Sequence, residues 1–75
     1  MQYDSADLVR RAMAAYFRAG GRDQPSDAES GVEEIDGRVY VVLRNTSGPL
    51  AVYRLTSQER LRVLRRWPAE IKAQA

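Results

Sequence analysis

The sequence predicts a small α+β domain, with an N-terminal amphipathic helix packed on one face of an antiparallel β-meander of three to four strands. Apolar residues recur with a helical period between residues 8 and 19, and the period changes to two from residue 32 onward. A chain of 75 residues is long enough for only one domain with a small core. We therefore expect a single domain over residues 1–75.

The helix is predicted over about residues 4–19. Asp4-Ser5-Ala6-Asp7 offers a short polar N-cap and an acid at the positive end of the helix. Gly20-Gly21 tolerates the left-handed conformation in which helices commonly end. The apolar side chains form an arc about 200° wide, in which we expect Phe17 to be buried. The arc comprises Leu8, Val9, Ala12, Met13, Ala15, Tyr16, Phe17 and Ala19.

An exposed acidic loop is expected at about residues 21–31, GRDQPSDAESG. This stretch combines proline, glycine, serine and short acids with no apolar period, so we expect it to bury nothing.

Three strands should follow the loop. Asp36-Gly37 is the dipeptide favoured in a type I′ hairpin turn, because both positions need positive φ, and it separates predicted strands at 32–35 and 38–44. The turn-forming residues 45–49 then lead to a third strand at 50–55.

The five-residue second loop sets the register of the sheet, because it places Arg44 opposite Leu50 and Tyr40 opposite Arg54. One face then becomes an apolar set suited to the helix: Val39, Val41, Leu43, Ala51, Tyr53 and Leu55. The other face carries Arg38, Tyr40, Val42, Arg44, Leu50, Val52 and Arg54. A single helix covers only one face, so we expect the second face to be exposed.

Residues 57–67 fit either a helix or a fourth strand. Thr56-Ser57-Gln58-Glu59 matches a helical capping box, whereas a strand at 60–67 continues the meander and exposes Arg60. We prefer the strand. Pro68 ends the element in either case, and the tail that follows is expected to form one helical turn anchored by Ile71.

The preferred strand would divide its side chains between the two faces of the sheet. Leu61, Val63 and Trp67 would share one side. Arg60, Arg62, Leu64 and Arg66 would share the other, which adds three arginines to the second face.

Charge is distributed unevenly along the chain. Residues 1–37 carry four arginines and eight acids, a net charge of −4, whereas residues 38–75 carry eight basic residues and two acids, a net charge of +6. This asymmetry suits binding to nucleic acid or to an acidic protein, and it equally allows the two halves to neutralise one another in the folded chain.

Composition argues against catalysis. The chain has no cysteine and no histidine, which excludes disulfides, thiol nucleophiles, histidine bases and the usual zinc and iron ligand sets. Glu33 and Glu34 are adjacent on a strand, so they point to opposite faces and cannot act as a catalytic pair. No glycine-rich phosphate loop is present. We expect no enzymatic activity, no cofactor and no metal.

Apolar runs reach only about five residues, far below the roughly 20 that a membrane span requires. We therefore expect no membrane association, and a cytoplasmic protein of a bacterium.

We interpret the chain as a non-catalytic interaction module, an accessory or regulatory protein that binds a protein partner or a second copy through the second sheet face. Tyrosine and arginine are enriched at the cores of protein interfaces. The candidate surface comprises Arg38, Tyr40, Val42, Arg44, Val52, Arg54, Arg60, Arg62 and Arg66.

The alternative is a nucleic-acid-binding protein. The arginines of the C-terminal half would neutralise phosphates, and Tyr40 and Trp67 would stack on unpaired bases. The sequence contains no established nucleic-acid-binding signature, and Glu33, opposite Tyr40 in the first hairpin, would weaken the positive charge.

Overall fold

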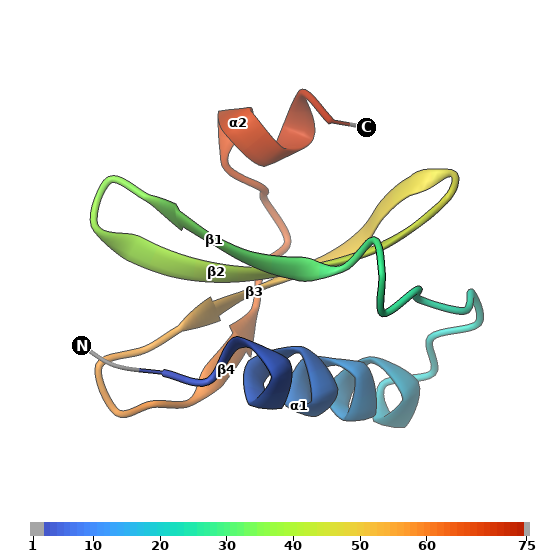
Figure 1. The fold of residues 1–75 in the computed structure, drawn as a ribbon, viewed down its shortest axis with the longest axis horizontal. Coiled ribbons are helices and arrows are strands. Elements are labelled where there is room, and N and C mark those ends of the chain that lie inside the picture. The colour runs from blue at the N-terminus through green and yellow to red at the C-terminus, as the bar shows by residue number, and fades with distance from the viewer. Residues whose placement is uncertain (1–2, 75) are drawn as a thin grey trace.

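The computed structural model describes residues 3–74. Its elements are α1 (Ser5–Arg18), β1 (Gly31–Ile35), β2 (Arg38–Asn45), β3 (Gly48–Leu55), β4 (Leu61–Val63) and α2 (Ala69–Lys72). The four strands form one antiparallel sheet in the order β1-β2-β3-β4. Figure 1 shows α1 and α2 on opposite sides of this sheet. The predicted α+β fold with a β-meander is confirmed.

Helix α1 begins at the predicted cap. The Asp4 Oδ1 accepts hydrogen bonds from the backbone N–H groups of Ala6, at 3.0 Å, and Asp7, at 3.3 Å. Gly20, with a φ of +91°, follows the last turn in the left-handed conformation.

The apolar arc of α1 is only partly buried. Leu8 and Ala12 are 3% and 0% exposed, but Phe17 is 45% exposed, so the prediction that Phe17 belongs to the core is wrong. A helix lying on a sheet buries a narrower stripe than the arc that the sequence offers. Phe17 instead packs edge to face on Tyr16, with ring centroids 5.5 Å apart.

The first hairpin has the predicted turn. Asp36 and Gly37 have φ values of +51° and +75°, and Ile35 pairs with Arg38 across them. These are the two positive φ values that a type I′ turn requires.

The second hairpin keeps the predicted register through a β-bulge. Tyr40 lies opposite Arg54 as expected, but the pairing shifts between Leu43 and Arg44. Arg44 therefore pairs with Pro49 and not with Leu50, and the strands continue to a tight turn at residues 46–47. The bulge absorbs the one-residue difference, so the shorter loop does not move Arg54 to the helix side.

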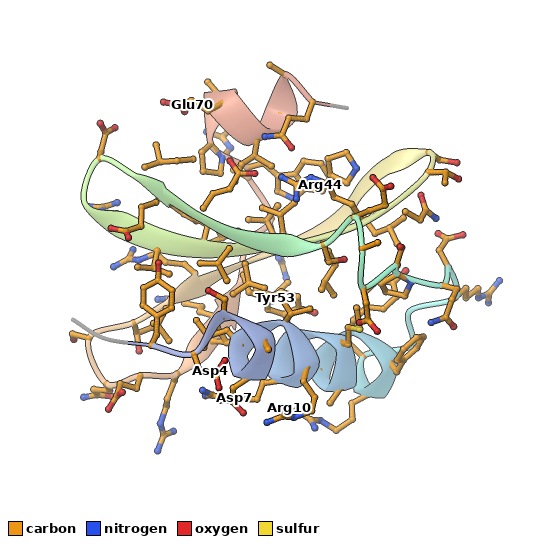
Figure 2. All side chains as sticks on the ribbon, in the orientation of Figure 1. Asp4, Asp7, Arg10, Arg44, Tyr53 and Glu70 are labelled. Carbon is orange, nitrogen blue, oxygen red and sulfur yellow. The ribbon has the colours of Figure 1, made fainter. Side chains whose placement is uncertain are left out.

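The main core lies between α1 and the sheet. Its buried residues are Leu8, Ala12, Val39, Val41, Leu43, Tyr53 and Leu55. Five of them belong to the apolar strand face that the predicted register created, and in Figure 2 Tyr53 lies between the sheet and α1.

The apolar part of the second sheet face is covered by the chain's own C-terminal segment, so the prediction that this face is exposed is wrong at Tyr40, Val42 and Val52. Strand β4 stops at Val63, and the next residue, Leu64, donates its backbone N–H to the Val52 carbonyl at 2.9 Å. The chain then crosses the second face, where Leu64, Trp67 and Ile71 pack in a second cluster. Ile71 is fully buried and anchors α2, as the sequence predicted.

The early end of β4 also changes which side Trp67 occupies. The preferred eight-residue strand placed Trp67 with Leu61, but Leu61 packs in the main core whereas Trp67 packs on the opposite side of the sheet. A three-residue strand no longer imposes the period of two beyond Val63, which is itself 59% exposed.

The loop before β1 is tied to the sheet. Asp23, Asp27 and Glu29 are exposed, but Pro25 is buried, so the expectation that this stretch buries nothing is wrong at that residue. The backbone N–H of Ser26 donates to the Arg44 carbonyl at 2.7 Å.

Candidate functional site

The structure removes the apolar part of the predicted interaction surface. Tyr40 is 7% exposed, and Val42 and Val52 are fully buried beneath the C-terminal segment. Val42 and Val52 are therefore not available to a partner in this conformation, and little of Tyr40 is exposed. The arginines of the predicted surface separate into three groups with different surroundings.

Arg44 is engaged inside the protein. Its guanidinium is ion-paired with the Glu33 carboxylate, and it donates from Nε to the Gln74 Oε1 at 2.9 Å and from Nη1 to the Glu29 carbonyl at 3.2 Å. Figure 2 shows Arg44 on the α2 side of the sheet. The Glu33 charge that would have weakened the surface is thus matched by Arg44.

Arg60 lies apart from the other arginines. It precedes β4 and lines a shallow depression with Leu61 and with residues of α1, among them Arg11 and Arg18. The prediction that a strand beginning at residue 60 would carry Arg60 on the second face is therefore wrong, because β4 begins only at Leu61.

The remaining arginines of the predicted surface gather on the second face. Arg54 lies directly opposite Arg62 on the neighbouring strand. Arg38 and Arg54 also line one depression with Arg66, and Tyr40 and Trp67 belong to the same lining. We call Arg38, Arg54, Arg62 and Arg66 the arginine cluster.

The backbone explains why these four residues meet. Arg38 precedes Tyr40 by two positions on β2, and Tyr40 pairs with Arg54, so both arginines point to the same side of the sheet. Arg66 arrives from the segment that crosses this face after β4.

No carboxylate forms an ion pair with the cluster within residues 3–74. The ion pairs there join Arg10 and Arg11 to Asp7 and Arg44 to Glu33. Asp36, in the β1–β2 turn, and Glu70, in α2, form no ion pair with the cluster. Arg38, Arg62 and Arg66 are exposed and Arg54 is half-buried, so their charge faces solvent.

A second cationic depression adjoins the first. It is lined by Arg65, Arg66, Trp67 and Lys72, so Arg66 and Trp67 border both depressions. Arg65 and Lys72 were not among the residues predicted from the sequence. The signal that points to them is the anchoring of α2 by Ile71, because a tail bound to the second face brings its neighbours to the same surface.

A different cleft runs between α1 and the start of β1. Its apolar lining includes Val9 and Met13, and its arginine, Arg10, is ion-paired with Asp7. Its one acidic lining residue, Asp27, forms no ion pair within residues 3–74, so this cleft is not a second cationic site.

The described part of the chain shows neither a metal cluster nor a membrane span. Among residues 3–74, no group of three or more acidic, histidine or cysteine side chains is placed to hold a metal ion. Neither α1 nor α2 has the length and apolar character needed to cross a membrane.

No protein-family model matches the chain, and no curated protein or solved structure is significantly similar to it.

Proposed function

We propose that this protein is a non-catalytic interaction module that binds nucleic acid through the arginine cluster. The observation that carries the proposal is the pairing of Arg54 with Arg62, directly opposite one another on adjacent strands and without an acidic partner among residues 3–74. Like charges in this position destabilise a sheet. Local conflicts of this kind are typical of functional surfaces, where a bound anion relieves the repulsion.

The chemistry of guanidinium favours phosphate. Arginine offers planar, bidentate donors that match phosphate oxygens and keeps its charge at any physiological pH. Several such groups on one surface suit a polyanion, because each neutralised phosphate releases a counterion.

The positions of the paired glutamates support a non-catalytic role. Glu33 faces α2 and is neutralised by Arg44, whereas Glu34 accepts a hydrogen bond from the Tyr3 hydroxyl at 3.1 Å. That hydrogen bond raises the pKa of Tyr3. The two carboxylates therefore lie on different faces of the sheet and cannot act together on one substrate.

An acidic protein is the second candidate partner. Trp67 is half-buried and bordered by arginines, and tryptophan and arginine dominate the binding energy of protein interfaces. The earlier hypothesis of self-association relied on exposed Val42 and Val52, which the C-terminal segment covers. A symmetric dimer through this face would also place its uncompensated cations together.

The proposal is tested by fluorescence anisotropy with labelled oligonucleotides at about 50 and 200 mM salt. We expect binding that weakens steeply with salt. The double variant Arg54→Gln/Arg66→Gln should weaken binding and reduce the salt slope by about 1.4, the value for two contacts to single-strand phosphates. The matched control Arg18→Gln/Arg22→Gln removes the same charge from two exposed positions outside the arginine cluster and should bind nearly as the wild type does.

Two results would overturn the proposal. If no oligonucleotide binds at low salt, nucleic acid is excluded as the ligand. Binding of polyglutamate under the same conditions would then favour an acidic protein as the partner. Equal losses in the two double variants show that binding follows net charge and not the arginine cluster.

A further inference from the structure

We infer that the nucleic acid is single-stranded and crosses Trp67, with phosphates in the two cationic depressions that Trp67 borders and a base stacked on its indole. This inference rests on the proposed function and adds the form of the ligand and its path. The observation behind it is that Trp67 borders both depressions, one with Arg38 and Arg54 and the other with Arg65 and Lys72.

The fold holds Trp67 in place for this role. It packs against the second cluster beside Leu64 and the fully buried Ile71, yet it remains half-exposed. Pro68 follows immediately and limits the backbone freedom of the residue before it. A positioned aromatic side chain loses little conformational entropy when a ligand stacks on it.

The alternation of charge and aromatic surface matches a single strand. Its phosphates recur on either side of each base, and its unpaired bases have free faces that stack on aromatic rings. A duplex has the same phosphates but keeps its bases stacked inside. An acidic peptide supplies carboxylates without a planar group between them.

The structure distinguishes between Tyr40 and Trp67, the two aromatic residues that the sequence suggested for base stacking. Tyr40 lines the first depression but is only 7% exposed and packs in the second cluster with Ile71, so its ring is not free to stack on a base. Trp67 is therefore the side chain that we assign to base stacking.

Trp67 is the only tryptophan of the chain, so its fluorescence reports directly on the contact. The wild-type protein is titrated with three probes of about ten nucleotides: single-stranded oligothymidine, an abasic strand of the same length and a duplex. Oligothymidine is expected to quench the fluorescence, and the abasic strand is expected to bind without quenching. We expect the abasic strand to bind roughly 5- to 150-fold more weakly, the loss that one stacked base represents.

Variants at the same position separate stacking from folding. Trp67→Phe keeps a smaller aromatic ring and should retain most of the affinity for oligothymidine, whereas Trp67→Leu should lower it to the level of the abasic strand. Phe17→Leu is the matched control, because Phe17 is an exposed aromatic residue on α1. Circular dichroism establishes that each variant is folded.

The outcomes distinguish this inference from the proposed function. Salt-dependent oligothymidine binding without a change in fluorescence, or a duplex bound as tightly as the single strand, overturns the single-strand path and leaves nucleic-acid binding in place. If no probe binds at low salt, the single-strand path and the proposed function are both overturned. If Trp67→Leu does not fold, the fluorescence of the wild-type protein still shows whether a base stacks on Trp67.

Discussion

Arg44 and Gln74, 30 positions apart in the chain, are joined by a hydrogen bond of 2.9 Å from the guanidinium Nε to the amide Oε1. The Gln74 Nε2 also donates to the Glu33 Oε2 at 3.2 Å, so one ion pair of the sheet is bonded to the end of the C-terminal segment. The backbone N–H of Gln74 donates to the Ile71 carbonyl at 3.0 Å, so this network adjoins the residue that anchors α2, on the face that a single N-terminal helix would have left open. The C-terminal segment is thus a structural layer of the domain, and it also shapes both cationic depressions.

Replacing Ile71 tests the importance of this layer. Ile71→Ala removes a fully buried side chain and should reduce the free energy of unfolding by about 2–5 kcal/mol. The neighbouring exposed Lys72 is the control, since Lys72→Ala should change it by less than about 0.5 kcal/mol. Urea denaturation measures both variants, and similar values for the two would mean that α2 is not packed on the sheet.

Large apolar side chains near the two ends of α1 are expected to contribute differently to stability. Leu8→Ala removes a side chain that is 3% exposed and should cost about 2–5 kcal/mol, whereas Phe17→Ala removes one that is 45% exposed and should cost markedly less. Thermal unfolding of the two variants measures the difference. A larger loss for Phe17→Ala would place the helix on the sheet in a different rotation.

Much of the fold was predictable because local chemistry and long-range packing agree. Short sequence patterns predict the Asp4 cap, the Asp36-Gly37 turn and the apolar sheet face that packs against α1. The burial of Phe17 was not predictable, because periodicity gives the direction of a helical side chain but not the width of the surface that covers it.

The candidate site was predictable only in part. The register that aligned Arg38 and Arg54 came from the hairpin turns, which are local features. The covering of Val42 and Val52 depends on where β4 ends, and an arginine-rich stretch with scattered apolar residues fits both a strand and a crossing segment. The sequence predicted an apolar surface framed by arginines. The structure shows a cationic surface on which Trp67 is half-exposed.

Neutralising one arginine of the opposed pair should stabilise the protein. Arg62→Gln removes the like charge facing Arg54, and we expect a gain of about a few tenths of a kcal/mol together with weaker oligonucleotide binding. The gain should diminish at high salt, because exposed charges are screened there. Arg65→Gln is the control for stability, since Arg65 follows β4 and is not paired with a residue of β3. Equal stabilisation by both variants would indicate a general effect of net charge.

Gly21 lies under the ring of Tyr16, and this close approach makes it sensitive to substitution. A Cβ at Gly21 would lie 2.3 Å from the nearest ring carbon of Tyr16, so Gly21→Ala forces the ring to move. The ring packs on Phe17, and its hydroxyl accepts a hydrogen bond from the Asp23 backbone at 3.3 Å. We expect a loss of about 1–3 kcal/mol in chemical denaturation. A Cβ at Gly31 meets nothing within 4 Å, so Gly31→Ala should have little effect, and equal effects would contradict the ring position.

Tyr53 should limit the stability of the protein at alkaline pH. Its side chain is 4% exposed in the main core, and burial is the largest of the effects that raise the pKa of its phenol above 10.0. In the unfolded chain the phenol ionises near its ordinary pKa of about 10, so the unfolded state loses this proton before the folded state does. The stabilising contribution is therefore complete below about pH 10 and is lost as the pH rises through the folded pKa. Tyr53→Phe removes this ionisation, and urea melts between about pH 8 and pH 11 should show a smaller alkaline loss of stability for the variant than for the wild type. Identical losses in the two proteins would mean that the Tyr53 phenol ionises equally well in the folded and unfolded states.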